Sequence, residues 1–259
     1  KKLAEAYEEL KDGVLPELRR SQMAVNFEIK RRTDDEILSL VDEDPTQLSK
    51  AEFLYGATVP ENLNEQIRIY DKMIEQYPND WRAYNNKGVV LVYQNNLDEA
   101  REQFEQANGL QENEMTQNNL GSISFMNKNY EEAASYFDNA AQAGSKEAAY
   151  NRGVIHIMNA EYQEAVDQFG TQNTFNSALA QLLNKDVSDA ESTINSVDSN
   201  NAWVDYLQAI VGARQNDQDQ VVNNLESAVK KNSSLKEYAR NDLEFGRYFE
   251  VDSFTSIVE

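Results

Sequence analysis

The sequence predicts an all-α solenoid of stacked helical hairpins, and three observations support this prediction. Three segments, 83–107, 116–140 and 148–172, align without internal gaps. In each, an alanine lies 12 positions after a glycine, and a phenylalanine follows four positions later. The glycines recur at steps of 33 and 32 residues, and such a fixed period is typical of repeat architectures. The aligned residues are Gly88, Gly121, Gly153, Ala100, Ala133, Ala165, Phe104, Phe137 and Phe169.

Each repeat is expected to form two helices joined by a polar turn. Glycine in the first helix and alanine in the second allow the backbones to approach closely, while the aromatic side chains fill the space beside them. Leu97, Tyr130 and Tyr162 begin the second helices, after the polar turns QNN, MNKN and MNAE. Because each hairpin leaves an apolar face that only the next hairpin can bury, the units are expected to stack.

This pattern resembles the tetratricopeptide repeat, in which small and large residues recur at these offsets over about 34 positions. Weaker copies flank the three clear repeats. An expected second helix ends at Pro78, and the 12-residue step recurs from Ala178 to Ala190 and from Ala209 to Val221. The resemblance implies a right-handed superhelix of about six helical hairpins.

The spacing also predicts one shortened unit and a closing helix. Only 25 residues separate Gly153 from Ala178, so the helix that contains Ala165 is expected to be short or its following loop tight. Residues 233–249 are expected to form one helix over the last repeat, with Ser233 or Ser234 as the N-cap.

These features divide the chain into four segments. We expect a helix–strand segment at 1–31, a helical N-terminal cap at 32–60, the repeat array at 61–232, and a capping helix with a tail at 233–259.

The stretch SQMAVNFEIKRR, residues 21–32, has the period of two of a half-buried β-strand. A lone strand needs a sheet, which a missing part of the protein, a second copy or a partner would supply. The preceding helix, Arg19, Arg20 and the strand resemble the end of an OmpA-like, peptidoglycan-associated module. The apolar face of 22–30 predicts self-association through this strand, or packing against the helix 3–10.

Charge and hydropathy exclude several partner classes. The chain has 45 acidic and 24 basic residues, a formal charge of −21. Phosphate binding needs clustered Lys and Arg, so nucleic acid and anionic membrane surfaces are disfavoured as partners. No apolar run approaches the roughly 20 residues that span a bilayer, so direct membrane insertion of this segment is not expected.

The residues that enzymes commonly use are scarce. There is no cysteine, and His156 is the only histidine, so neither a Cys–His pair nor a multi-histidine metal site can form. His156 falls where the repeat places a packing residue. G-x-S-x-G and Walker-type glycine motifs are also absent. The sequence therefore predicts a protein that is not an enzyme, without catalytic residues, metal or cofactor.

The repeat register predicts a peptide-binding groove. In a tetratricopeptide superhelix the first helices line the concave face, and here the residue two before each glycine is asparagine. Primary amides suit an extended peptide, because each offers a donor and an acceptor to its backbone. The candidate groove residues are Arg82, Asn85, Asn86, Val89, Asn118, Asn119, Ser122, Tyr150, Asn151 and Val154.

A subset of the family clamps a partner's C-terminal carboxylate with Lys and Arg beside such asparagines. The matching positions here are Arg82, Met115 and Glu147, so a full basic clamp is missing.

The whole layout is similar to Gram-negative cell-envelope proteins that join OmpA-like modules to tetratricopeptide arrays. This resemblance implies a non-catalytic scaffold in the periplasm or at the outer membrane that binds a protein or peptide partner. The alternatives are a cytosolic adaptor or co-chaperone, and the accessory repeat region of a larger enzyme.

Overall fold

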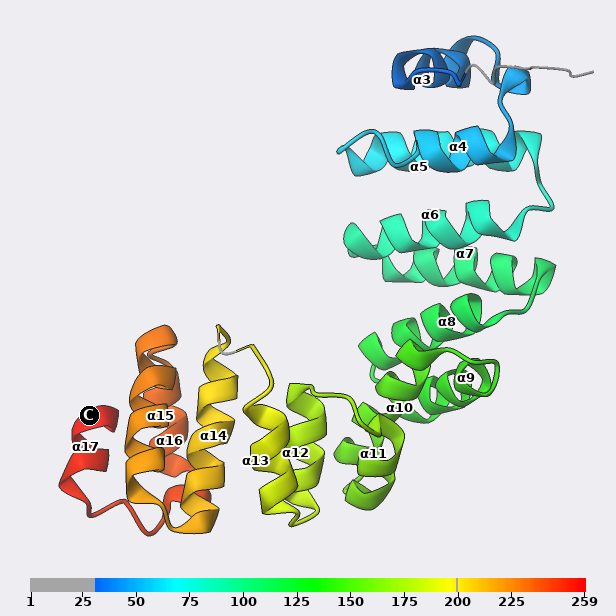
Figure 1. The fold of residues 1–259 in the computed structure, drawn as a ribbon. Coiled ribbons are helices and arrows are strands. Elements are labelled where there is room, and N and C mark those ends of the chain that lie inside the picture. Colours follow the sequence, from blue (N-terminus) through cyan, green and yellow to red (C-terminus); the bar gives the residue numbers. More distant parts are fainter. Residues whose placement is uncertain (1–30, 199) are drawn as a thin grey trace, which may run out of the picture.

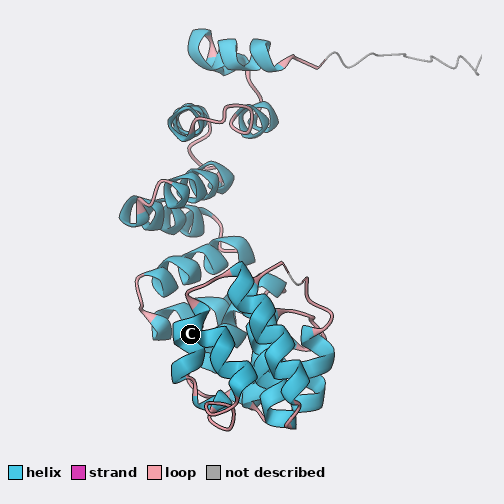
Figure 2. Ribbon diagram, turned by 90° about the vertical axis from the view of Figure 1, so that its left-hand side faces the viewer, coloured by secondary structure: helices cyan, strands magenta, loops and turns pink. Residues whose placement is uncertain are grey.

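The computed structural model describes residues 31–198 and 200–259, and every regular element in these ranges is helical (Figure 2). They form fifteen α-helices and two 3₁₀ helices, with no strand in the described ranges. The strand predicted at 22–30, the helix before it and the arginine pair lie outside the described residues.

Most of the helices form consecutive pairs in a curved array that changes direction around α10 and α11 (Figure 1). The pairs are α6 (Trp81–Tyr93) with α7 (Leu97–Leu110), α8 (Glu114–Met126) with α9 (Tyr130–Gln142), α10 (Lys146–Met158) with α11 (Tyr162–Phe169), α12 (Phe175–Leu183) with α13 (Val187–Ile194), and α14 (Ala202–Gln215) with α15 (Gln218–Lys231).

Shorter elements flank these pairs at both ends. Before them lie α3 (Asp34–Glu43), the 3₁₀ helix η2 (Pro45–Gln47), α4 (Lys50–Gly56) and α5 (Leu63–Gln76). After them lie α16 (Leu235–Asn241), the 3₁₀ helix η3 (Leu243–Phe245) and α17 (Asp252–Val258).

The turn inside each of the five pairs has the same hydrogen-bonded form. One residue adopts a left-handed conformation, and the N–H of the next residue bonds to the carbonyl five positions earlier, as Asn96 does to Leu91 at 2.9 Å. This Schellman-type closure satisfies carbonyls at the end of the first helix. The left-handed residues are Asn95, Lys128, Ala160, Lys185 and Asn216.

Close packing at the glycine is found in all three clear repeats, and the atoms that lie against the glycine belong to the phenylalanine ring. A Cβ atom added to Gly88, Gly121 or Gly153 would lie only 2.6–2.7 Å from the ring of Phe104, Phe137 or Phe169, respectively. Real Cβ atoms essentially never come so close. The glycine is therefore required, because the ring occupies the space that a side chain would fill.

The shortened unit is also confirmed. Helix α11 has eight residues, and Gly170, which directly follows its last residue, has a φ of +57°. The following α12 and α13 are short as well, with nine and eight residues.

The single closing helix predicted at 233–249 is wrong, because the chain turns at Asp242. The Asp242 carboxylate accepts hydrogen bonds from the Glu244 N–H at 3.0 Å and the Tyr206 hydroxyl at 2.9 Å, and η3 begins there. Ser234 does occupy the N-cap of α16, as predicted, but its side chain makes no capping hydrogen bond.

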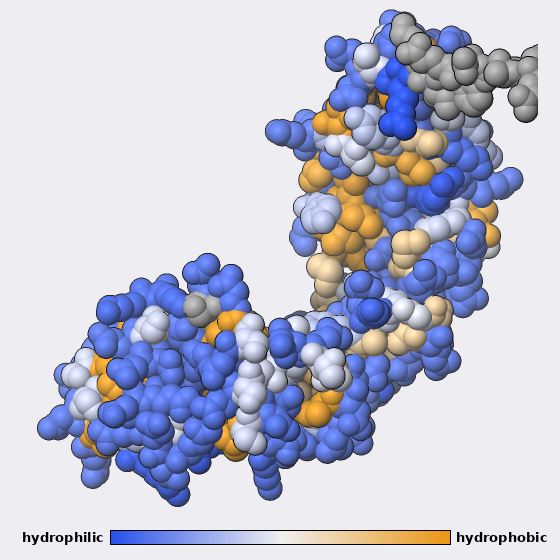
Figure 3. Space-filling model, viewed as in Figure 1, coloured by the Kyte–Doolittle hydropathy of each residue, from blue (hydrophilic) through white to orange (hydrophobic). Residues whose placement is uncertain are grey.

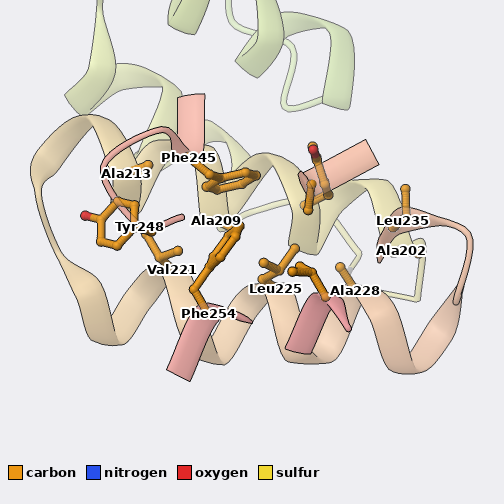
Figure 4. Close-up of a cluster of buried hydrophobic side chains, with 13 residues drawn as sticks. Ala202, Ala209, Ala213, Val221, Leu225, Ala228, Leu235, Phe245, Tyr248 and Phe254 are labelled. Carbon is orange, nitrogen blue, oxygen red and sulfur yellow. The ribbon is translucent and has the colours of Figure 1, made fainter. Parts of the chain in front are cut away.

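Aromatic side chains complete the core at the C-terminal end. Phe245 from η3 and Phe254 from α17 point toward Ala209 and Val221, and all four are buried (Figure 4). Leu235 and Ala239 of α16 belong to the same buried cluster, so three short elements cover the last pair, where the sequence predicted one helix.

We expect Gly121→Ala to destabilise the fold by about 1–3 kcal/mol, because the new methyl group overlaps the buried Phe137 ring. Gly109→Ala, on the exposed part of α7 with no atom near the added Cβ, is the matched control. It should stabilise by up to about 1 kcal/mol through helix propensity. Urea unfolding measures both. Equal effects at the two sites would contradict the proposed close packing.

Candidate peptide-binding surface

The first helices of the pairs lie on the inner side of the array. Helix α8 contacts α10 directly, and α12 contacts α14. Short amide side chains bridge neighbouring first helices: Asn119 Nδ2 donates to Asn85 Oδ1 at 2.9 Å, and Asn151 Nδ2 donates to Asn118 Oδ1 at 3.1 Å. Bridges this short indicate that these helices face the inside of the curve.

The predicted asparagine row is therefore also a set of bonds between repeats. Asn176 Nδ2 donates to the Tyr150 hydroxyl at 2.8 Å, which continues the row to α12. Asn85 is buried and donates to Asn86 at 3.2 Å. Part of the amide hydrogen-bonding capacity is thus used within the solenoid. Peptide binding by these residues stays a prediction.

Arg82 forms an ion pair at the start of α6. Its Nε and Nη2 atoms donate to the Asp80 carboxylate at 2.8 and 2.6 Å, and Lys50 Nζ lies 3.1 Å from the same carboxylate. The hydrogen bonds from Arg82 lower the pKa of the buried Asp80 to about 2. Arg82 is thus engaged in an ion pair within its own chain.

Three predicted residues meet at a small pocket between α8 and α10. Ser122, Asn151 and Val154 line a cavity of about 160 Å³ together with Phe125, Met126 and Phe137. Val89, which has the corresponding position on α6, is half-buried and packs with the neighbouring core cluster outside this pocket.

Met126, which lines this pocket, was not among the predicted residues, although the repeat register contains a signal for it. The residue five after each glycine is large, apolar and exposed: Tyr93, Met126 and Met158. Solvent-exposed methionines at recurring positions are typical of adaptable binding surfaces.

Charge is divided unequally between the two sets of helices. The first helices, α6, α8, α10, α12 and α14, contain five basic and three acidic residues. The second helices, α7, α9, α11, α13 and α15, contain three basic and thirteen acidic residues. The inner helices are therefore close to neutral, whereas the outer helices carry much of the negative charge.

His156 contacts a neighbouring residue of its own chain. Its side chain is half-buried, and Nδ1 lies 2.7 Å from a carboxylate oxygen of Glu161 in the following turn. Among the described residues, no three His, Cys, Asp or Glu side chains are placed to hold a metal ion. No helix in the same ranges is long and apolar enough to cross a membrane.

Family models identify the repeats directly. Residues 69–102 match one tetratricopeptide repeat model, and residues 90–147 and 127–172 match another. Neither is a match to an OmpA-like module. The predicted count of six repeats stays a prediction, because these matches cover residues 69–172. No curated protein matches the chain in sequence.

Many solved structures share this fold. One is YrrB, described as a TPR protein with an unusual peptide-binding site, at 20% identity and a TM-score of 0.51, covering 63% of this chain and 92% of YrrB. PilF of Pseudomonas aeruginosa has 18% identity and a TM-score of 0.58, over 84% and 98% of the two chains. PilW, a type IV pilus biogenesis factor, has 14% identity and a TM-score of 0.58, over 89% and 100%.

Asn85→Ala should destabilise by about 1–3 kcal/mol, because it removes a buried amide and leaves the Asn119 donor without its acceptor. The double variant with Asn119→Ala should show a coupling energy of about 0.5–1.5 kcal/mol. Asn223→Ala, an exposed site on α15, is the control and should change stability by about 0.5 kcal/mol or less. Additive effects of the paired variants in urea unfolding would disprove the bridge.

The Asp80–Arg82 pair predicts a loss of stability in acid. Folding lowers the pKa of Asp80 from 3.8 to about 2, so its stabilisation is present above pH 4 and is lost as the pH falls through about 2. Asp80→Asn should cost about 2 kcal/mol at neutral pH and less in strong acid. Urea unfolding over this pH range measures the unfolding free energies of the variant and the wild type, which should converge in acid. A difference that does not depend on pH would contradict the role assigned to Asp80.

Proposed function

We propose that this tetratricopeptide-repeat array is a non-catalytic scaffold that binds an extended protein segment along its inner helices. The observation that carries the proposal is the pocket between α8 and α10 on a nearly neutral inner surface, in a protein whose outer helices are acidic. The nearly neutral inner surface offers little opposite charge to attract a charged segment. An apolar side chain, in contrast, can be buried in the pocket.

The pocket has the size of one side chain. Its volume of about 160 Å³ compares with the roughly 150 Å³ of an engineered apolar protein cavity that binds benzene. Phe125, Met126 and Val154 supply apolar contacts, and the flexible Met126 can adjust to the side chain that enters. Arg152, the nearby cation of α10, is paired with Asp138 at 2.9 Å. A leucine, isoleucine or methionine is the expected anchor.

Related folds support the general role. Tetratricopeptide repeats are generally protein-interaction modules, and YrrB is described as having a peptide-binding site. The candidate residues Asn86, Asn118, Asn119, Ser122, Tyr150, Asn151 and Val154 would contact the bound segment beside the anchor.

We place this scaffold in the cell envelope, at the periplasm or outer membrane. The support is the resemblance of residues 1–31 to an OmpA-like module and the pilus-related folds of PilF and PilW. Fractionation of cells that express the full reading frame tests this placement. Recovery only from the cytosol would favour the adaptor alternative, and a catalytic domain in the same frame would favour the accessory-region alternative.

The proposal predicts peptides with one apolar anchor. Selection from a random-peptide library should enrich sequences that share a Leu, Ile or Met. Val154→Glu should weaken the selected peptides at least about tenfold, because a carboxylate would occupy an apolar pocket.

Leu110→Glu, an equally drastic change at an exposed site of α7, is the matched control and should leave binding unchanged. Thermal unfolding followed by circular dichroism confirms that both variants are folded. Peptides that bind Val154→Glu as tightly as the wild type would refute the assigned pocket.

A further inference from the structure

A second pocket lies at the C-terminal end of the inner surface, between the first turn of α14 and helix α16. Its volume is about 590 Å³. We call it the Trp203 pocket; its lining residues are Trp203, Tyr206, Glu237, Tyr238, Asn241 and Asp242. Trp203 and Tyr238 are 39% and 58% exposed, so two large rings of this pocket are open to solvent.

The Trp203 pocket continues the row of inner residues described above. In the repeat register, Trp203 has the position of Arg82, and Tyr206 has the position of Asn85. A segment that follows the inner helices toward the C-terminus therefore reaches this pocket last.

The planes of the Tyr206 and Tyr238 rings are steeply inclined to the plane of the Trp203 ring. The centroids of Trp203 and Tyr206 are 5.5 Å apart with an interplanar angle of 68°, and those of Trp203 and Tyr238 are 5.4 Å apart at 77°. Steeply inclined rings form adjacent walls. Electron-rich ring faces attract cations, and Trp is the strongest of the three aromatic residues in this respect.

The charged groups at the pocket are acidic. Glu237 and Asp242 line it, and the hydrogen bonds recorded for Asp242 come from neutral donors, the Tyr206 hydroxyl and the Glu244 N–H. Burial, and then the hydrogen bond to Asp242, raise the pKa of Tyr206, which therefore keeps its proton.

The neighbouring cations do not line the pocket. Arg214 lies close enough to Asp242 for an electrostatic interaction, but its guanidinium pairs with Glu244 at 2.5 Å. Lys236 lines a different hollow beside α17, and Arg240 Nε donates to the Val258 carbonyl at 2.6 Å. Lys231 Nζ lies 2.6 Å from the carboxylate of the buried Asp205. No lysine or arginine is among the residues that line the Trp203 pocket.

We propose that the Trp203 pocket binds the guanidinium group of an arginine side chain in a partner protein. The planar guanidinium stacks on aromatic faces and donates hydrogen bonds to carboxylates, and these are the two chemistries that the pocket offers. The net charge of −21 attracts basic segments over a longer range. This site is independent of the apolar pocket between α8 and α10. It selects a positively charged side chain, whereas that pocket selects an apolar one.

Trp203 fluorescence tests the proposal. The background variant is Trp81→Phe, which leaves Trp203 as the single tryptophan. The probes are acetyl-Gly-Ser-Arg-Ser-Gly-amide and the same peptide with citrulline, the neutral isostere of arginine, titrated at constant ionic strength. The arginine peptide should produce a saturable change with a Kd about three- to thirtyfold lower than that of the citrulline peptide. Added salt should weaken its binding.

Variants identify the groups that bind. Tyr238→Ala removes one wall and Glu237→Gln removes one charge, and both side chains are exposed, so the fold is expected to persist. Each should weaken the arginine peptide about threefold or more. Glu250→Gln, an exposed acid outside the pocket, should have no effect.

Three outcomes would overturn the assignment. The first is an equal response to the arginine and citrulline peptides. The second is unchanged affinity in Tyr238→Ala. The third is tighter binding of tetramethylammonium than of the arginine peptide, which would assign the pocket to quaternary amines. Val154→Glu should leave arginine binding intact, so failure at one pocket is distinguishable from failure at the other.

Discussion

The contact between a glycine and a phenylalanine ring sets the spacing of the helices in this solenoid. In three successive pairs the ring lies where a Cβ atom would otherwise stand, so the two helices approach to a distance that a larger residue would prevent. The buried alanines, Ala100, Ala133 and Ala165, keep the second helices equally close. Because these three pairs share the same internal contact, each of them meets a neighbour of similar shape and can stack on it.

Stacking in turn brings the inner side chains of neighbouring repeats within hydrogen-bonding distance. The bonds of Asn119 to Asn85 and of Asn151 to Asn118 link residues more than thirty positions apart in the chain. These amides fix the repeats relative to one another and also line the surface proposed to bind a partner. A substitution of these amides is therefore expected to change both binding and stability. A substitution of an exposed apolar residue at the pocket, such as Met126, is better suited to change binding alone.

The first and second helices of the pairs differ in charge, and this difference has different consequences on the two sides of the array. Thirteen acidic residues on the second helices of the five pairs favour solubility and repel polyanions. In the view of Figure 3, the arm that contains α12 to α17 shows mostly hydrophilic residues. The inner helices, with few charges, leave room for selection by shape and apolar contact. The Trp203 pocket adds a cation-selective position at one end, so the inner surface offers two different chemistries to one extended partner.

The sequence by itself determined the features that depend on one repeat unit. The glycine, alanine and phenylalanine offsets, the polar turns and the shortened α11 all follow from spacing within about 35 residues, because helix geometry relates such positions directly. Only the tertiary structure decided what depends on side chains from different units. The pairing of Asn85 with Asn119, the pocket rimmed by Met126, the Trp203 pocket and the turn at Asp242 each require that the curvature of the whole stack place distant residues together. The pattern of a single repeat contains no information on that curvature.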